Sequence, residues 1–172
     1  MNFFSFYGFE VQFDINENEL KKAYYEKMRS LHPDMHMQAS ESEKELLLQQ
    51  SSYNNKAYNT LKDFNARLQY ILQEFGPKTD EKPLLPPNFL MEMMEVNEEV
   101  MELQFDFSLE KADSIKKAIE AQQEEQLKSL ESVLKDKSIE TSLDVELSSA
   151  IQDYLMKRNY LIRIIENIEK LT

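Results

Sequence analysis

Apolar residues recur along most of the chain at intervals of three and four positions, the spacing that places them on one face of an α-helix. Sustained alternation of apolar and polar residues, which is typical of half-buried strands, is hard to find, and the sequence has no Asn-Gly or Asp-Gly hairpin turn. The pattern therefore predicts an all-α protein. Helical segments are expected at about residues 3–9, 16–31, 41–61, 65–75, 88–105, 108–135 and 142–171.

Glycine and proline are rare, and most of them fall in one stretch. The 2 Gly stand at positions 8 and 76, and all of the 5 Pro except Pro33 fall between positions 77 and 87. Proline fixes φ and lacks an N–H donor, while glycine accepts the left-handed conformation that ends many helices. The sequence therefore predicts a semi-rigid linker at 76–87 that joins a domain at 1–75 to a second domain at 88–172.

The helices of each predicted domain suggest how that domain is built. In the first, two long helices joined by a loop indicate an antiparallel hairpin, with short flanking helices covering its open face. In the second, three helices each carry a single apolar stripe that cannot be buried alone, which favours a three-helix bundle. An extended hairpin of two helices is the alternative, although the helix at 88–105 is too apolar to remain undocked.

The composition excludes several classes of function. The 172 residues include 20 Lys and Arg against 32 Asp and Glu, a net charge of -12, so binding to nucleic acid or to an anionic membrane surface is not expected. Cysteine is absent, which excludes disulfides, thiolate-bound metals and a cysteine nucleophile within this chain. No apolar run approaches the roughly 20 residues of a membrane-spanning helix, and the N-terminus does not resemble a targeting peptide. We expect a cytoplasmic protein.

The loop between the second and third helices carries the most distinctive chemistry. Its sequence is His32-Pro33-Asp34, and Pro33 disfavours the helical conformation for the residue before it. An imidazole and a carboxylate are thereby held beside a helix end, an arrangement that suits docking into a polar groove of another protein. The alternative is an ordinary helix end in which Asp34 starts a turn.

A cluster of positive charge precedes this loop within an otherwise acidic chain. Four basic residues and one acid lie between positions 21 and 29. A cationic helix face would accelerate association with an acidic partner, whereas the alternative is a helix face that simply contacts water. The basic residues are Lys21, Lys22, Lys27 and Arg29.

The stretch from Lys21 to Asp34 resembles the second helix and loop of a J domain, the co-chaperone module that drives ATP hydrolysis by DnaK-class chaperones. The aromatic start at 3–9, the segments 55–61 and 67–72, and the leucine, methionine and glutamate run at 88–95 extend the resemblance to the HscB family, the J proteins of iron–sulfur cluster assembly. The resemblance implies that the His-Pro-Asp loop and the four basic residues bind a DnaK/HscA-class chaperone. The chain departs from the family at Asn54, usually aliphatic, and at Phe64, usually proline, which puts the shape of the turn after the third helix in question.

The helix predicted at 88–105 combines acidic and apolar residues. No Lys or Arg occurs between positions 88 and 110, and the helix has more apolar positions, many of them methionine, than one buried stripe requires. Methionine adapts to irregular partner surfaces, so the pattern indicates a protein-binding face; the alternative is methionines in the core and hydrated acids. The resemblance implies that this face binds an iron–sulfur scaffold protein of the IscU type through Leu90, Met91, Glu95, Glu98 and Glu102, together with Tyr160 on the last helix.

An enzyme is the first rival to this interpretation. His32, Asp34 and His36 are conceivable metal ligands, but Pro33 breaks the helix that would align the two imidazoles. The sequence has no His-Glu-x-x-His pattern and no glycine-rich phosphate loop. We therefore expect no enzymatic activity, no metal and no cofactor.

The expected function is a co-chaperone that stimulates a chaperone ATPase and delivers the scaffold to it. The alternative is a J-domain co-chaperone or helical adaptor for a different client.

Overall fold

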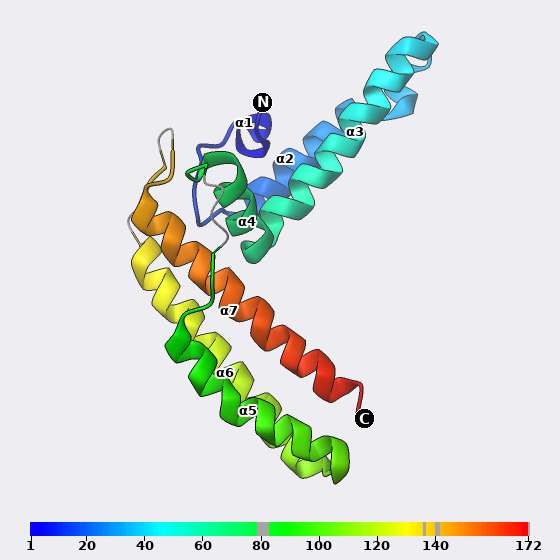
Figure 1. Ribbon diagram of the computed structural model, residues 1–172. Helices are drawn as coiled ribbons and strands as arrows, with labels where there is room; N and C mark the ends of the chain where they lie inside the picture. Colours follow the sequence, from blue (N-terminus) through cyan, green and yellow to red (C-terminus); the bar gives the residue numbers. More distant parts are fainter. Residues whose placement is uncertain (79–82, 136, 140–141, 172) are drawn as a thin grey trace. The chain divides into compact units, whose positions relative to one another are not determined.

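The computed structural model describes residues 1–78, 83–135, 137–139 and 142–171, without the side chain of Pro33. These residues form seven α-helices and one short 3-10 helix and contain no strand, which confirms the all-α prediction (Figure 1). The elements are α1 (Phe3–Tyr7), α2 (Glu17–Ser30), η1 (Pro33–His36), α3 (Glu41–Lys62), α4 (Phe64–Phe75), α5 (Pro87–Phe105), α6 (Leu109–Leu134) and α7 (Val145–Glu169).

The chain divides into two compact units. The N-terminal unit holds Met1–Gly76 together with Ser138–Ser142, and the C-terminal unit holds Pro77–Lys137 and Leu143–Thr172. The division falls beside the linker predicted at 76–87, of which residues 79–82 lie outside the described residues. The assignment of 1–75 and 88–172 as separate domains stays a prediction.

In the N-terminal unit, α2 and α3 run side by side, α1 packs against both of them and α4 packs against α3 (Figure 1). The core forms where these helices meet. Each buried side chain of this size contributes about 1.5–3 kcal/mol of transfer free energy. The side chains with no solvent exposure include Phe4, Leu20, Leu61, Leu68 and Ile71.

The two glycines end helices by different means. Gly8 follows α1 with φ 77°, the left-handed conformation that the sequence predicts for it. Gly76 follows α4 with φ -73° and ψ 161°, so the expectation of a left-handed conformation is wrong there. Its N–H donates to the Leu72 carbonyl at 3.0 Å, and a Cβ at position 76 would collide with that oxygen. Position 76 therefore requires glycine because a side chain would not fit, and not because the backbone has a positive φ.

The C-terminal unit is the predicted three-helix bundle. Helix α5 packs against both α6 and α7, so the alternative of an extended two-helix hairpin is wrong. Phe89, Met93 and Leu103 of α5 are buried in one cluster with apolar residues of α6 and α7. Helix α7 begins at Val145 instead of residue 142, because the Asp144 side chain caps it by accepting the Leu147 N–H at 2.8 Å.

Within the part of the chain that the structure describes, no helix combines the length and the low polarity that crossing a lipid bilayer requires.

Candidate functional site

The His-Pro-Asp segment forms a sharp corner between two helices. Helix α2 ends at Ser30, and His32 adopts an extended conformation with φ -67° and ψ 136°, as expected for a residue before proline. Its Nδ1 accepts the Asp34 N–H at 3.3 Å, which in a neutral imidazole leaves the ring hydrogen on Nε2. The same Nδ1 lies 3.5 Å from Asp34 Oδ2, so a proton on Nδ1 would make an ion pair there.

Hydrogen bonds hold this corner (residues 32–34) on both sides. The ring Nε2 of His36 lies 2.7 Å from the Ser30 carbonyl oxygen, and since a carbonyl only accepts, that nitrogen donates. Beyond the loop, Ser40 and Glu43 form a reciprocal capping box that starts α3. Hydrogen bonds from the Ser40 hydroxyl and N–H keep the pKa of Glu43 below its usual value. Hydrogen bonds thus tie the segment around the corner to the end of α2 and cap the start of α3.

The functional groups of the corner are open to solvent. The side chain of His32 is 57% exposed and that of Asp34 is 85% exposed. The end of the α2–α3 pair that carries η1 extends beyond α1 and α4 (Figure 1). Met35 and Met37 beside the corner are also exposed. A partner can reach the imidazole and the carboxylate without any rearrangement of the N-terminal unit.

The basic residues of α2 lie on two different sides of the helix. At about 100° per residue, Lys21, Lys22 and Arg29 fall within one arc, and all three are exposed. We call these three residues the cationic face. Lys27 lies on the opposite side, half-buried, with its Nζ 4.4 Å from the centroid of the Phe6 ring. The expectation that Lys27 shares one cationic helix face with the other three is wrong, because Lys27 contacts α1.

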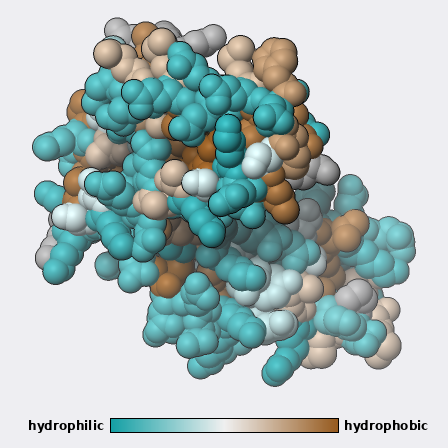
Figure 2. All heavy atoms as spheres, turned by 90° about the horizontal axis from the view of Figure 1, so that it is seen from below, coloured by the Kyte–Doolittle hydropathy of each residue, from teal (hydrophilic) through white to brown (hydrophobic). Residues whose placement is uncertain are grey.

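Helix α5 presents a broad apolar surface to solvent. Five of its large apolar side chains are between 40% and 88% exposed, whereas Met93 on its packed side is 2% exposed. Hydrophilic residues cover most of the visible surface of the molecule, and apolar side chains appear between them in patches (Figure 2). The five exposed residues of α5 are Leu90, Met91, Met94, Met101 and Phe105.

Acidic residues border this surface on one side. On an ideal helix, the five exposed apolar residues and three glutamates fall within an arc of about 140°, with the buried residues on the opposite side. The glutamates Glu95, Glu98 and Glu102 are all exposed. We call these eight residues the α5 face. The arrangement combines apolar area with negative charge, as a binding surface for a basic, apolar partner requires.

Tyr160 of α7 lies at the edge of the α5 face and is held there by α5. Its hydroxyl accepts a hydrogen bond from Asn97 Nδ2 at 2.8 Å, and its ring meets the Phe89 ring edge-on at 5.7 Å between centroids. Tyr160 is half-buried against the core of the C-terminal unit. The structure thus brings five residues of the sequence-predicted scaffold site to one face and places Tyr160 beside it.

A family model, curated relatives and solved structures that match this chain are all named HscB. The family described as "HSCB C-terminal oligomerisation domain" matches residues 85–169. The co-chaperone HscB homologues of Vibrio cholerae and Colwellia psychrerythraea are 36% and 34% identical over 102 and 100 residues. These matches cover 58% and 57% of this chain, and the chain spans 60% and 57% of the relatives' lengths.

Two solved structures match almost the whole chain. Chaperone HscB from Vibrio cholerae is 26% identical with a TM-score of 0.71, and the match covers 99% of this chain and 96% of that one. The human co-chaperone HscB is 26% identical with a TM-score of 0.76, covering 99% of this chain and 81% of that one. Residues 85–169 belong to the family of HscB C-terminal domains, and the chain as a whole is similar to HscB structures.

The two positions where the sequence departs from the HscB pattern are accommodated locally. Asn54 is fully buried, and its Oδ1 accepts from the Tyr7 hydroxyl at 2.7 Å while its Nδ2 donates to the Tyr24 carbonyl at 3.3 Å. Burial raises the pKa of Tyr7, so its hydroxyl remains a donor. At the second position, Phe64 starts α4, and Asp63 caps that helix by accepting the Ala66 N–H at 2.7 Å. The Asp63 cap therefore starts α4 with a phenylalanine at its first helical position.

Sequence reasoning missed three residues that lie on or beside these surfaces. Tyr25 is exposed and falls within the arc of the cationic face, and Phe105 widens the α5 face, as do Met94 and Met101, which are among the methionines that already indicated a binding face there. Asn97, which positions Tyr160, was also not singled out. Helical periodicity applied to each predicted helix separately would have grouped Tyr25 and Phe105 with the assigned residues, whereas the Asn97 contact depends on packing between helices.

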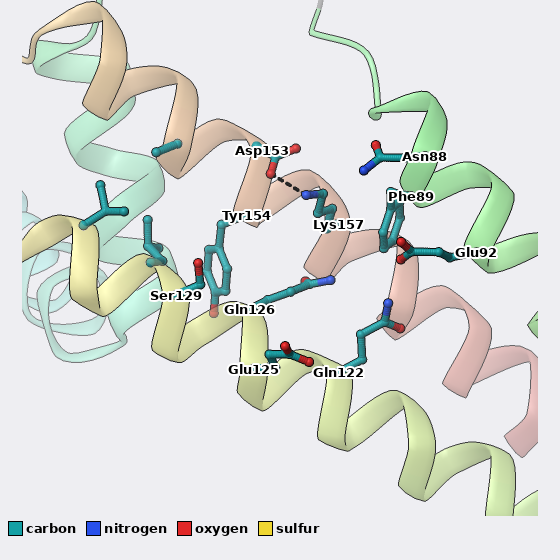
Figure 3. Close-up of a pocket in the computed structure, with 13 residues that line it drawn as sticks. Asn88, Phe89, Glu92, Gln122, Glu125, Gln126, Ser129, Asp153, Tyr154 and Lys157 are labelled. Atoms are coloured by element: carbon teal, nitrogen blue, oxygen red, sulfur yellow. Dashed lines mark ion pairs between the residues drawn. The ribbon is translucent and has the colours of Figure 1, made fainter.

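A polar pocket of about 460 Å³ lies among the three helices of the C-terminal unit (Figure 3). Asp153 and Lys157 of α7 form an ion pair at 2.6 Å beside it, and the Lys157 ammonium lies 5.7 Å from the Phe89 ring centroid. Among the described residues, no group of three His, Asp or Glu side chains is placed to hold a metal ion. The exposed surfaces of α2, η1 and α5 carry most of the sequence-predicted site residues and are the candidate functional sites.

Proposed function

We propose that this protein is a co-chaperone that stimulates the ATPase of a DnaK/HscA-class chaperone and delivers to it an iron–sulfur scaffold protein of the IscU type. The observation that carries the proposal is the exposed, hydrogen-bonded His32–Asp34 corner beside a cationic face, in a chain that is similar to HscB structures. The relatives in Vibrio cholerae and human are themselves named as HscB chaperone or co-chaperone.

On the chaperone side, charge and fixed geometry have separate roles. Lys21, Lys22 and Arg29 attract an acidic surface of the ATPase domain and mainly raise the association rate. The corner then supplies a ring N–H and a carboxylate whose backbone is already ordered, so little conformational entropy is lost on docking. Hydrolysis is accelerated in the chaperone, and no bond is made or broken by this chain.

On the scaffold side, the α5 face supplies apolar area with an acidic border. Burial of its exposed apolar residues under a partner releases about 25 cal/mol per Å² of apolar surface, from which the cost of association is subtracted. Glu95, Glu98 and Glu102 favour a partner that has basic side chains around an apolar centre. Both partners bound to one chain meet at raised effective concentration.

The test is ATP turnover by a purified DnaK/HscA-class chaperone with and without this protein. We expect stimulation by the full chain and a further increase when an IscU-type scaffold is added. An unchanged turnover rate would refute the co-chaperone role. Stimulation that ignores the scaffold, together with no measurable scaffold binding, would favour the alternative of a J-domain co-chaperone with a different client.

A further inference from the structure

Apart from Met1, the exposed methionines of the described residues lie on or beside the proposed partner-binding surfaces. The chain has 9 methionines, and apart from Met1 five of them are exposed. Met35 and Met37 flank His36 beside the corner, and Met91, Met94 and Met101 lie on the α5 face. The remaining three, Met28, Met93 and Met156, are half-buried or buried.

We propose that Met91, Met94 and Met101 form a methionine-oxidation site, and that their conversion to sulfoxide by a peroxide-class oxidant releases the scaffold from the α5 face. This inference rests on the function proposed above. The modification is the two-electron oxidation of a thioether. The sulfur attacks one oxygen of hydrogen peroxide, an S–O bond forms as the O–O bond breaks, and the other oxygen leaves as water, so the peroxide is reduced.

The composition directs a peroxide to the exposed methionines, which on α5 are these three side chains. The chain has 0 Cys and 0 Trp, so methionine sulfur is its most readily oxidised group. Within α5, the exposed fractions of Met91, Met94 and Met101 are 70%, 60% and 57%, whereas that of Met93 is 2%. Oxidation depends on access to the sulfur, so the three exposed residues react before Met93.

The consequence follows from where the three sulfurs lie. A sulfoxide is polar and bears a strong hydrogen-bond acceptor, so burying it under an apolar partner without a donor carries a desolvation cost. The border of glutamates adds no donor to compensate. Three such groups within one arc turn an apolar centre into a polar one, while the core on the opposite side of α5 is untouched. Methionine sulfoxide reductases reverse the change, so the site can be reset.

The experiment treats the full chain with hydrogen peroxide, maps the sulfoxides by peptide mass spectrometry and measures affinity for an IscU-type scaffold by calorimetry. We expect sulfoxide at Met91, Met94 and Met101 well before Met93, at least a tenfold loss of scaffold affinity, and recovery after treatment with methionine sulfoxide reductases A and B. The matched control is the M91L/M94L/M101L variant, which keeps the apolar face without sulfur. The affinity of this variant is compared with its own untreated value, and peroxide should lower it less than twofold.

A second variant removes the dependence on oxidation conditions. M91Q/M94Q/M101Q places polar amides at the same sites and should bind the scaffold at least tenfold more weakly, with unchanged far-ultraviolet circular dichroism. Scaffold affinity that survives full oxidation of the three methionines, or an equal loss in the leucine variant, overturns the oxidation site alone. Failure of the untreated protein to bind the scaffold overturns the proposed scaffold role as well, so the two failures are distinguishable.

Discussion

The corner at residues 32–34 and the α5 face are both exposed, but they are built on opposite principles. The corner presents a few polar atoms whose positions are fixed by hydrogen bonds at 3.3 Å and 2.7 Å within one short loop. The α5 face presents several flexible apolar side chains with no hydrogen bond among them in the described structure. A surface of the first kind depends on individual atoms, whereas one of the second kind depends on total apolar area.

The same contrast explains why the two surfaces tolerate change differently. Replacing a single ring in the corner removes a donor and an acceptor that no neighbour can replace. On the α5 face, one apolar side chain can substitute for another of similar volume with little loss, because area rather than atomic position carries the interaction. Substitutions on the two surfaces should therefore separate chaperone stimulation from scaffold binding.

The largest effect is expected from His32→Gln. The amide cannot reproduce the ring that both accepts the Asp34 N–H and presents a second nitrogen to a partner. We expect stimulation of the chaperone ATPase to fall by about thirtyfold or more, the scale of a binding hot spot of ~2 kcal/mol. Single-turnover ATP hydrolysis measures this loss, and scaffold affinity should remain within twofold.

The matched control is His36→Gln, the same substitution four residues later in the same loop. The glutamine amide can still donate to the Ser30 carbonyl, as His36 does. Stimulation should therefore stay close to the unmodified level. If the two variants lost activity equally, the corner would be acting only through its backbone shape, and the role given to the His32 ring would be wrong.

The second effect concerns the α5 face. Leu90→Ala combined with Met91→Ala removes apolar area from the face without touching the core, and should weaken scaffold binding by more than about 1 kcal/mol. Calorimetry measures the affinity. ATPase stimulation in the absence of scaffold should not change. Leu109→Ala, an exposed leucine at the start of α6, is the control and should bind normally; retained affinity in the double variant would move the binding surface elsewhere.

A smaller effect distinguishes the two sides of α2. Lys21→Gln with Lys22→Gln should lower the association rate with the chaperone severalfold at low ionic strength, and the difference should shrink as salt is raised. Lys27→Gln should leave the association rate and its salt dependence nearly unchanged, because Lys27 packs over the Phe6 ring. Stopped-flow kinetics measure both. An equal effect of Lys27→Gln would mean that its charge acts at the chaperone surface after all.

The fold was predictable because local signals agree with one another. Asn16 caps α2, Gly8 ends α1 and the three-and-four spacing of apolar residues sets the packed face of each long helix. The sequence places the start of α7 too early, at residue 142, because the apolar spacing already fits a helix there. Only the structure shows that the Asp144 side chain caps the helix, so that α7 begins at Val145. The conformation of Gly76 was predicted wrongly because glycine is needed there for its close approach to the Leu72 carbonyl oxygen. The sequence does not reveal that contact.

The candidate sites were predictable in residue type more than in orientation. A residue before proline favours an extended backbone, so Pro33 turns the chain at His32. The geometry of the corner therefore follows from three adjacent residues. Lys27 was grouped with its basic neighbours by charge, although helical phase places it among the packed positions of α2. The contact between Asn97 and Tyr160 joins residues 63 positions apart, and no local pattern encodes it.

The smallest effect is expected from Tyr160→Phe, which tests whether Tyr160 belongs to the α5 face or only supports it. The change removes the acceptor of the Asn97 hydrogen bond but keeps the ring against Phe89. Asn97 still donates to the Met93 carbonyl at 2.6 Å, so we expect a loss of about 1 kcal/mol in stability, or about 2–4 °C in the midpoint of thermal unfolding. Scaffold affinity should change less than twofold. An affinity loss as large as that of the Leu90 and Met91 double variant, without a change in the midpoint, would show that the hydroxyl itself contacts the scaffold, because only a direct contact weakens binding while leaving the folded state as stable as before.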